Sequence, residues 1–383
     1  MKLQTLIFLG LVFLMISCAK NSNNKQVGGA MKVIDLDRND QISIKDYFNE
    51  IEIIPLETNL NSLLPFLIGE TDKVIKSNDK FYFLNRKEDV IIIFDFHGKF
   101  TKRINWKGKG PNEYLSINDF IINRFNGNIE ILSPENNSIF VYDSTGNTFI
   151  EKIRLPSEMP IVHLFQIVTS DTYILYSLAA NAELFFYSKQ TKQTIKTEYN
   201  LPKWFHRNTP FAPSSRNPFY IYNDSLFFQQ IYNGDVYNID TNDQKLNLRY
   251  SWDFGEYNFN IAEIPTDKSL EYYLNLNNKY ALLFQVYCEN SKYYFTRFKF
   301  KNRYKHLIYN KLTNEYKLFD KFSEGFQCVP QWIDDNAIYT FISPEYLKFV
   351  INQEVLNEKN KIIFNSIREE DNPIIIKYTF KSL

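Results

Sequence analysis

The sequence predicts an all-β fold, and within that class a β-propeller, on three observations. Short runs of β-type residues alternate with turn residues along most of the chain. Aromatic residues make up 17% of the sequence, with 34 Phe and 26 Tyr, as expected for a β-rich protein. One strand–turn–strand pattern also recurs at intervals of about 40–50 residues, which is typical of a propeller blade with four strands.

The first residues predict a lipoprotein signal peptide. A short basic start precedes an apolar stretch from Leu6 to Ile16, which is too short to span a bilayer. The sequence Met-Ile-Ser-Cys at residues 15–18 resembles the lipobox of bacterial lipoproteins, in which the cysteine is diacylated and becomes the mature N-terminus. We therefore expect residues 1–17 to be removed and Cys18 to carry the lipid that holds the protein at a membrane. The alternative is a signal peptide with a chance cysteine near its end.

Residues 18–32 are predicted to be the lipidated cysteine and a flexible tether, because Asn21 to Ala30 is polar and has no hydrophobic period. In related lipoproteins of Bacteroidota, acidic residues just after the cysteine act as a surface-export signal. Residues 19–22 are Ala, Lys, Asn and Ser, and none is acidic. We expect a lipid-anchored protein of the cell envelope that faces the periplasm.

Residues 33–383 are predicted to form a single domain. The 44 basic and 44 acidic residues cancel, so nothing in the charge favours nucleic acid as a partner. No cofactor is expected.

The repeated unit is an apolar strand, a short turn and a returning strand. Equivalent turn positions lie 48, 45, 52 and 70 residues apart, and they are Asp95, Asp143, Ser188, Asp240 and Asn310. The first two turns contain a glycine and the other three do not. Each such unit is a sheet whose two faces need neighbours, so the units are expected to close into a ring.

Residues 89–142 resemble the NHL repeat, and more closely the six-bladed β-propeller lipoproteins of Bacteroidota. The family pattern is roughly Gly-x-Gly-Pro-Gly-Glu-Tyr, followed by a strand that contains Asp-Phe. The matching residues are Gly108, Gly110, Pro111, Glu113, Tyr114 and Asp119. Asn112 stands where the family has Gly, and Asn also tolerates positive φ. The resemblance spans residues 50–380 in outline and its first third in detail.

The resemblance implies six four-stranded blades, each running outward from the channel. They are expected at about 67–106, 115–155, 160–200, 215–255 and 279–321, with a sixth built from 327–343, 373–380 and an outer strand from 50–57. Pairing the two ends of the chain in this way avoids an open sheet edge. Residues 264–279 and 344–367 have helical spacing and are predicted to be two short helical insertions, the second with an apolar stripe of Leu347, Val350, Ile351 and Val355.

The segment from Gly108 to Tyr114 is predicted to be a tight turn that joins two blades. Its two glycines and proline suggest unusual φ values. Glu113 would accept backbone N–H groups, and Tyr114 would wedge between the blades. A phosphate cradle needs a following helix, whereas a strand follows here. The alternative is that Lys109 or Glu113 contacts a ligand.

The loop from Pro202 to Pro218 is the candidate ligand-binding segment. Rigid aromatic rings beside arginine suit sugar stacking or the recognition of carboxylates and peptides. The candidate residues are Trp204, Phe205, His206, Arg207 and Arg216. We expect this loop, the 108–114 segment and the insertion after Ser343 to share one face, at the mouth of the central channel. The alternative is a long loop whose aromatic residues are buried.

Signals for catalysis are weak. The histidines at 97, 163, 206 and 306 are scattered, with no metal-binding spacing, so neither a metal site nor a catalytic residue is predicted. We expect a non-catalytic envelope protein that binds a glycan, a peptide or a protein partner at its loop face. The alternative is an NHL-type lyase or a calcium-dependent lactonase, which fold analogy alone supports. A cluster of His, Asp and Glu in the channel would favour the enzyme, and a channel lined by Tyr, Trp and Asn would favour binding.

Cys288 and Cys328 could pair in an oxidising envelope. The predicted blades place them at opposite ends of adjacent inner strands, beyond the roughly 7 Å that a disulfide allows between Cα atoms. Two buried thiols are expected.

Overall fold

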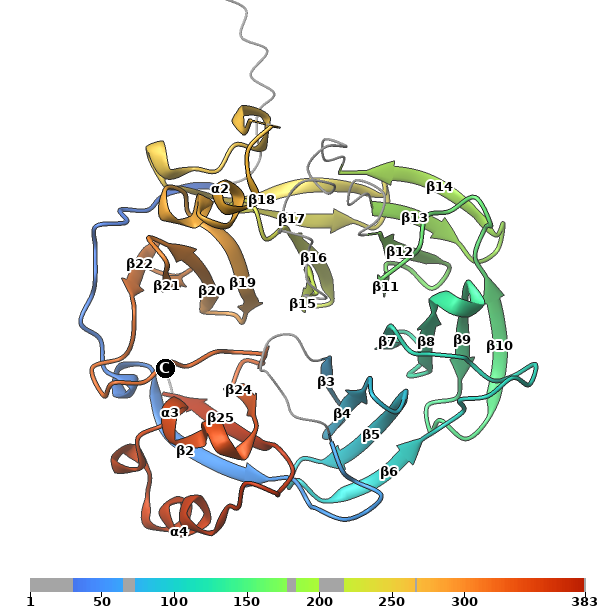
Figure 1. Cartoon of the computed structure of the whole chain (residues 1–383), viewed down its shortest axis with the longest axis horizontal. Coiled ribbons are helices and arrows are strands. Elements are labelled where there is room, and N and C mark those ends of the chain that lie inside the picture. Colours follow the sequence, from blue (N-terminus) through green and yellow to red (C-terminus); the bar gives the residue numbers. More distant parts are fainter. Residues whose placement is uncertain (1–29, 65–72, 178–183, 200–216, 266, 382–383) are drawn as a thin grey trace, which may run out of the picture.

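The computed structural model describes residues 30–64, 73–177, 184–199, 217–265 and 267–381. These residues form six blades of four antiparallel strands each, arranged in a ring (Figure 1), and one of the six sheets gains a fifth strand. The predicted six-bladed β-propeller is confirmed.

The first three blades are consecutive four-stranded meanders, and the innermost strand comes first in each. Their strands are β3 (Val74–Ser77), β4 (Lys80–Asn85), β5 (Val90–Asp95) and β6 (Phe100–Ile104); β7 (Asp119–Ile122), β8 (Ile129–Ser133), β9 (Ser138–Tyr142) and β10 (Phe149–Arg154); β11 (Leu164–Ile167), β12 (Thr172–Tyr176), β13 (Leu184–Ser188) and β14 (Gln193–Glu198).

Blades 4 and 5 repeat this order, while blade 6 takes its outermost strand from the N-terminal part of the chain. Their strands are β15 (Phe219–Tyr222), β16 (Ser225–Gln229), β17 (Asp235–Asp240) and β18 (Lys245–Asp253); β19 (Leu282–Glu289), β20 (Tyr293–Phe300), β21 (Arg303–Asn310) and β22 (Glu315–Phe319); β23 (Trp332–Ile333), β24 (Ala337–Ile342), β25 (Ile374–Phe380) and β2 (Phe48–Pro55).

The hydrophobic core lies between neighbouring blades. The middle strands are buried on both faces, as in β5, where Val90 to Phe94 are all buried, because each blade packs against a neighbour on either side. Between blades 1 and 2, Tyr82, Ile91, Tyr114 and Phe120 belong to one apolar cluster. The ring therefore holds together through blade-to-blade packing.

The five predicted turns all lie between the third and fourth strands of a blade, after β5, β9, β13, β17 and β21. Gly98 and Gly146 take positive φ three residues into their turns. The turns without glycine place the positive φ one residue later, at Lys192, Gln244 and Asn314. The repeat seen in the sequence is therefore a repeat of one hairpin.

The predicted ring closure is also confirmed. β2 pairs antiparallel with β25, from Phe48 opposite Phe380 to Pro55 opposite Ile374. The outer edge of β2 is covered by helix α4 (Glu358–Ser366), whose Asn360 accepts a hydrogen bond from the Ile53 N–H (2.7 Å). The closing strand thus has partners on both sides.

The N-terminal segment of the domain continues around the outside of the ring. β1 (Ala30–Val33) adds parallel to β18 as a fifth strand of blade 4, so the predicted tether at 18–32 overlaps a strand at its end. Residues 34–47 then run along the outside of blade 5 (Figure 1), where the Asp40 N–H donates to the Leu318 carbonyl (2.7 Å) and the Leu318 N–H donates to the Asp40 carboxylate (2.8 Å). We call residues 34–47 the strap.

The helical elements are short and lie mostly in the two predicted insertions. The α-helices are α2 (Leu270–Leu274), α3 (Leu347–Val350) and α4, and the 3₁₀ turns are η1 (Ile44–Asp46), η3 (Pro134–Asn136), η4 (Gly255–Tyr257), η5 (Ile261–Glu263), η6 (Leu276–Asn278), η7 (Pro344–Tyr346) and η8 (Gln353–Val355). Among the described residues, no helix has the length and apolar character needed to cross a membrane.

The apolar stripe predicted for residues 347–355 is not one helix, which corrects the sequence-based expectation. α3 ends at Val350 because Ile351 takes an extended conformation (φ −152°, ψ 135°), and the chain turns again at η8. Leu347 and Ile351 are still buried in the core. The spacing of these apolar residues therefore reflected burial and not a continuous helix.

Candidate functional site

The candidate site is the central channel of the propeller. Its wall is made by the innermost strands β3, β7, β11, β15, β19 and β23 (Figure 1), and it encloses a cavity of about 190 Å³. Every blade contributes at least one lining residue. A concave site lined by all repeats is the usual place for a ligand in such a ring.

The channel wall combines apolar, aromatic and uncharged polar side chains. The aromatic residues are Phe219, Tyr220, Tyr287 and Trp332, and the carboxamides are Gln166, Asn217, Gln285 and Gln331. Several of these polar groups are already used within the protein: the Tyr220 hydroxyl donates to Glu289 (3.1 Å), and Gln331 bonds both backbone groups of Phe341. The remaining polar groups decide what the channel can recognise.

Lys73 is the cation of the described channel lining, and Asp119 neutralises it. Lys73 Nζ lies 3.0 Å from Asp119 Oδ1, and both side chains are buried, at 7% and 1% exposed. The second carboxylate oxygen of Asp119 accepts a hydrogen bond from the Phe165 N–H (3.0 Å). Asp119 thus joins blades 1, 2 and 3, which gives the Asp-Phe pair of the sequence a structural role at the channel rim.

Gln285 is a polar residue of the described wall whose carboxamide has a buried donor without a partner. Its Oε1 accepts a hydrogen bond from an Arg297 Nη (2.8 Å), while its Nε2 is buried without a hydrogen-bond partner. Arg297 itself is fixed against the ring of Tyr304, 4.1 Å from the centroid. The residue as a whole is only 1% exposed, so bulk water does not satisfy this donor.

Strand β19 around Gln285 is irregular in a way that the sequence did not reveal. Its pairing with β20 slips twice, between Leu282 and Gln285 and again between Gln285 and Cys288. Leu283 and Val286 both take positive φ, at 58° and 59°, a conformation that is strained for large or β-branched residues. No glycine or asparagine marks either bulge, so sequence reasoning had no signal for them.

At the opposite end of the channel, side chains connect the turns of different blades. Arg124 donates to the carbonyl of Val168 (2.8 Å) in blade 3 and to that of Asp224 (2.6 Å) in blade 4. Lys76 forms an ion pair with Asp334 across blades 1 and 6 (3.2 Å). The mouth at Lys73, where the innermost strands begin, is therefore the end considered for ligand entry.

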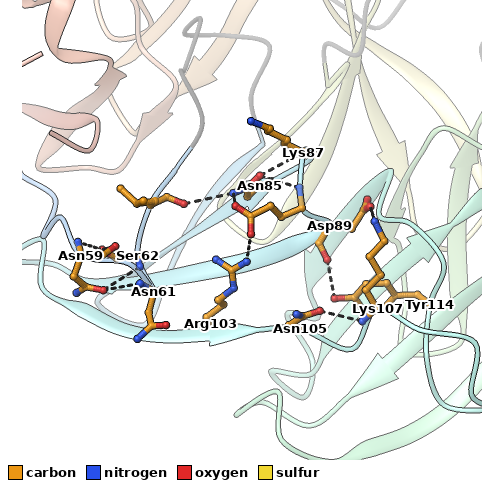
Figure 2. A network of polar contacts seen from close by, with 12 residues as sticks. Asn59, Asn61, Ser62, Asn85, Lys87, Asp89, Arg103, Asn105, Lys107 and Tyr114 are labelled. Atoms are coloured by element: carbon orange, nitrogen blue, oxygen red, sulfur yellow. Dashed lines mark hydrogen bonds and ion pairs between the residues drawn. The ribbon is translucent and has the colours of Figure 1, made fainter. Parts of the chain in front are cut away.

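The 108–114 segment lies at the junction of blades 1 and 2, away from the channel lining (Figure 2). Tyr114 is fully buried; its hydroxyl donates to the Asp89 carbonyl (3.0 Å) and accepts from the Trp106 N–H (3.1 Å). Burial raises the pKa of Tyr114 to about 12. Lys107 pairs with the Asp89 carboxylate (2.6 Å). These contacts are those of a connector between blades.

The glycines of this segment serve a purpose other than the predicted one. Neither Gly108 nor Gly110 takes positive φ, and Asn112 does not either. Glu113 accepts a hydrogen bond from the Gly110 N–H (2.7 Å), and a Cβ at position 108 would lie 1.9 Å from Glu113 Oε2. The glycines leave room for the Glu113 side chain, while Pro111 and Lys109 are exposed.

Two buried acidic residues outside the channel lining are fully engaged by the protein. Burial raises the pKa of Glu130, whose carboxylate accepts hydrogen bonds from Tyr173 and Asn123 (both 2.6 Å). Glu289 pairs with Arg249 and Lys311, each at 2.9 Å. Both arrangements connect strands and leave no open position for a substrate.

The remaining predicted residues fall in different places. Cys18 and the loop residues Trp204, Phe205, His206, Arg207 and Arg216 lie outside the described residues. His97 is exposed in a hairpin turn, and within the described ranges no group of three or more His, Cys, Asp or Glu side chains could hold a metal ion.

Cys288 and Cys328 are both buried and unpaired, so the prediction of two buried thiols is confirmed. They belong to the same apolar cluster at the junction of blades 5 and 6. Burial raises the pKa of Cys328 to about 12, and it also raises the pKa of Cys288. Both thiols are thereby kept in the protonated, unreactive form.

A second hollow of about 440 Å³ lies outside the ring, beside blade 4. Its polar lining residues are largely paired with each other: Asp235 accepts from Ser251 (2.7 Å) and Asn258 donates to Asp253 (2.5 Å). Trp252, which also lines this hollow, has a buried indole N–H without a hydrogen-bond partner. The channel, although smaller, is lined by residues of all six blades, and it is therefore the candidate site.

Comparisons with known proteins identify the family and confirm the fold. A family model described as a domain of unknown function, DUF4934, matches residues 31–379. A solved structure from Bacteroides fragilis NCTC 9343, of a protein thought to be exported, is similar with a TM-score of 0.68 and 16% identity, over 92% of this chain and 100% of that one. A member of the DUF4221 family from Bacteroides vulgatus is similar with a TM-score of 0.52 and 12% identity, over 87% of this chain and 97% of that one. No curated protein matches the sequence.

Proposed function

The chain belongs to the DUF4934 family, whose function is unknown, and from that premise we propose that it is a lipid-anchored, non-catalytic binding protein of the cell envelope. Its ligand, a glycan, a peptide or a segment of a partner protein, enters the channel from the loop face, where the innermost strands begin.

The observation that carries this proposal is the chemistry of the channel wall. Aromatic rings and carboxamides line it, and the cation present, Lys73, is paired with a buried carboxylate. Aromatic faces stack on sugar rings or apolar side chains, and carboxamides supply both donors and acceptors. Such a surface suits uncharged polar ligands, because the ionisable group of its described lining, Lys73, is already engaged by Asp119.

The location in the envelope is supported by two independent features. The first eighteen residues resemble a lipoprotein signal with Cys18 as the acylated residue, and the similar Bacteroides fragilis protein is thought to be exported. Two or three acyl chains would hold the protein stably at a membrane.

The anchor is tested by replacing its cysteine. We expect Cys18→Ala to move the protein from the membrane fraction to the soluble fraction, because no acyl chain can be attached. Cys328→Ala is the matched control, since that thiol is buried in the domain, and it should leave the protein at the membrane. Fractionation and metabolic labelling with a fatty-acid analogue measure both. A Cys18→Ala protein that remains acylated would overturn the anchor.

The binding function is tested on a glycan and peptide array with residues 31–383, which contain every described strand except the first residue of β1. The expected result is saturable binding to one class of uncharged ligand, which is recovered intact after incubation. Recovery of a cleaved ligand would contradict the non-catalytic role, and an empty array would contradict glycan and peptide binding.

A further inference from the structure

We propose that Gln285 is the ligand-recognition residue of the channel, where its Nε2 donates a hydrogen bond to a carbonyl oxygen of an uncharged ligand. An acetamido group of a sugar or a peptide bond would supply that oxygen. The inference deepens the proposed function and rests on it for the identity of the channel as the binding site.

The orientation of the Gln285 carboxamide is fixed by its neighbour. A guanidinium group has donors and no acceptor, so the carboxamide atom that faces Arg297 must be the oxygen, as the 2.8 Å contact shows. The nitrogen is then directed away from Arg297. Arg297 is in turn held over the ring of Tyr304, which leaves the carboxamide little freedom to flip.

The free donor of Gln285 is one of several buried side-chain groups without a partner, and within the described channel lining it is the uncharged one. Nearly all buried polar atoms in proteins have a partner, because an unsatisfied one loses its hydrogen bonds to water without replacement. Gln285 is 1% exposed and belongs to the channel lining, yet its Nε2 has no partner in the protein. Neighbouring atoms of the wall cover this nitrogen, so a ligand oxygen in the channel would satisfy the donor by displacing them.

The backbone on either side of Gln285 is strained in a way that favours this role. The two slips in the pairing of β19 place Leu283 and Val286 at positive φ. Bulges of this kind redirect side chains and are common beside binding and active sites. Because side chains alternate between the faces of a strand, removing one bulge would turn Gln285 to the other face. The bulges therefore determine where the carboxamide points.

The charge of the wall sets the class of ligand. Lys73 is compensated by Asp119 at 3.0 Å, and the other polar side-chain groups of the described lining are carboxamides, phenols, the indole of Trp332 and the thiol of Cys288. A net charge on the ligand would lose its hydration without gaining a counter-charge. A neutral carbonyl oxygen carries no such penalty.

The test replaces one atom of the side chain in the full-length protein. Gln285→Glu keeps the oxygen that Arg297 needs but removes the N–H donor, so the fold is expected to keep or increase its melting temperature. N-acetylglucosamine and N-acetylalanine methylamide are the probes, and calorimetry should show binding to the variant at least tenfold weaker. Gln193→Glu, on the exposed strand β14, adds the same charge away from the channel and should bind like the wild type.

A crystal of the wild-type protein soaked with N-methylacetamide gives a second readout that does not depend on the natural ligand. We expect the carbonyl oxygen of the probe within hydrogen-bond distance of Gln285 Nε2. Absence of the probe from that position, or equal binding of both sugar and peptide probes to wild type and Gln285→Glu, would overturn the inference. A probe bound at Gln285 beside an empty array would instead remove the proposed glycan and peptide function and leave the recognition residue in place.

Discussion

His306 shows how a buried residue of this propeller couples its stability to pH. It lies in β21, 4% exposed, stacked on Phe319 with 5.4 Å between ring centroids. Burial, together with the nearby positive charge of Arg297, lowers its pKa from the ordinary value of 6.5 to about 3. The folded protein therefore keeps His306 neutral at a pH where the unfolded chain binds a proton.

This difference predicts a loss of stability in acid. Between pH 6.5 and pH 3 the unfolded state takes up the proton and the folded state does not, so the free energy of unfolding falls by about 1.4 kcal/mol per pH unit. We expect His306→Phe to remove this dependence. Between pH 7 and pH 5 the free energy of unfolding of the variant should therefore fall by about 2 kcal/mol less than that of the wild type. Urea unfolding at the two pH values measures this. Exposed His97 is the control, and an equal pH dependence in His306→Phe and His97→Phe would contradict the assignment.

At the scale of single residues, the sequence predicted where residues of the 108–114 segment lie better than it predicted why those residue types are needed there. Tyr114 and Glu113 were expected at a blade junction, and the structure shows Tyr114 buried between blades 1 and 2 and Glu113 bonded to the Gly110 backbone. Gly108 was expected for its backbone freedom, whereas it provides space for the Glu113 carboxylate. Gln285 carried no signal at all, because an unsatisfied donor is a property of its surroundings and not of its residue type.

At the scale of elements, strand β19 stores conformational strain beside the channel. Val286 is a β-branched residue with φ of 59°, a conformation that costs on the order of 1–3 kcal/mol. Val74, in β3, is also a half-buried valine of the channel lining but does not take positive φ. The two residues form a matched pair for measuring the strain.

We expect Val286→Gly to be less destabilising than Val74→Gly by about 1–2 kcal/mol, because glycine takes positive φ without a steric penalty. Both substitutions remove a similar apolar side chain and add similar freedom to the unfolded chain. The free energies of unfolding in urea provide the comparison. Equal losses at the two positions would show that the backbone at residue 286 is not strained.

Elements with a local signal were predictable, and those formed by tertiary contacts were not. The five hairpins carry the same turn chemistry, so their positions in the sequence gave the blades directly. The apolar residues at 347–355 have helical spacing, yet the helix ends at Val350 and Ile351 is extended. The Ile351 side chain is buried in the core from this extended backbone, so its burial does not require a helix. Strand β1 is a short segment whose conformation depends on its pairing with β18.

At the scale of the whole molecule, the N-terminal segment secures three blades in succession. β1 extends blade 4, the strap crosses blade 5, and β2 closes blade 6. The strap also inserts apolar side chains into the core, where Ile34, Leu36, Ile42 and Ile44 are all buried. Closure of the ring thus depends on one pairing, and the strap reinforces it.

Two truncations separate these contributions. A chain that begins at residue 48 loses β1 and the strap but keeps β2. We expect it to fold with a free energy of unfolding lower by roughly 2–5 kcal/mol, because the loss of buried apolar surface outweighs the conformational entropy that no longer has to be lost on folding. A chain that begins at residue 58 also loses β2, and we expect it to aggregate because β25 becomes an open edge. Circular dichroism and size-exclusion chromatography distinguish the two, and a folded, monomeric chain from residue 58 would contradict the role of the closing strand.

The closed ring itself was the most predictable feature of this protein. Sheets of similar length recurring along a chain have two faces to bury, and a ring gives each face a neighbouring sheet. The candidate site was predicted at the channel mouth with loop residues between 204 and 216, which lie outside the described residues. Its described lining was not predicted, because those residues come from six separate strands. Their combined polarity emerges only when the blades are assembled.

The parallel pairing of β1 with β18 fixes the direction in which the N-terminal strand joins the propeller. β18 runs from the hairpin turn at Lys245 to Asp253, on the side where the innermost strands begin, and β1 follows the same direction. β1 therefore begins on the side of the hairpin turns and runs toward the side where the innermost strands begin. The described part of the chain thus starts at the end of the ring opposite the opening beside Lys73, which leaves that opening clear of the point where the N-terminal segment joins the domain.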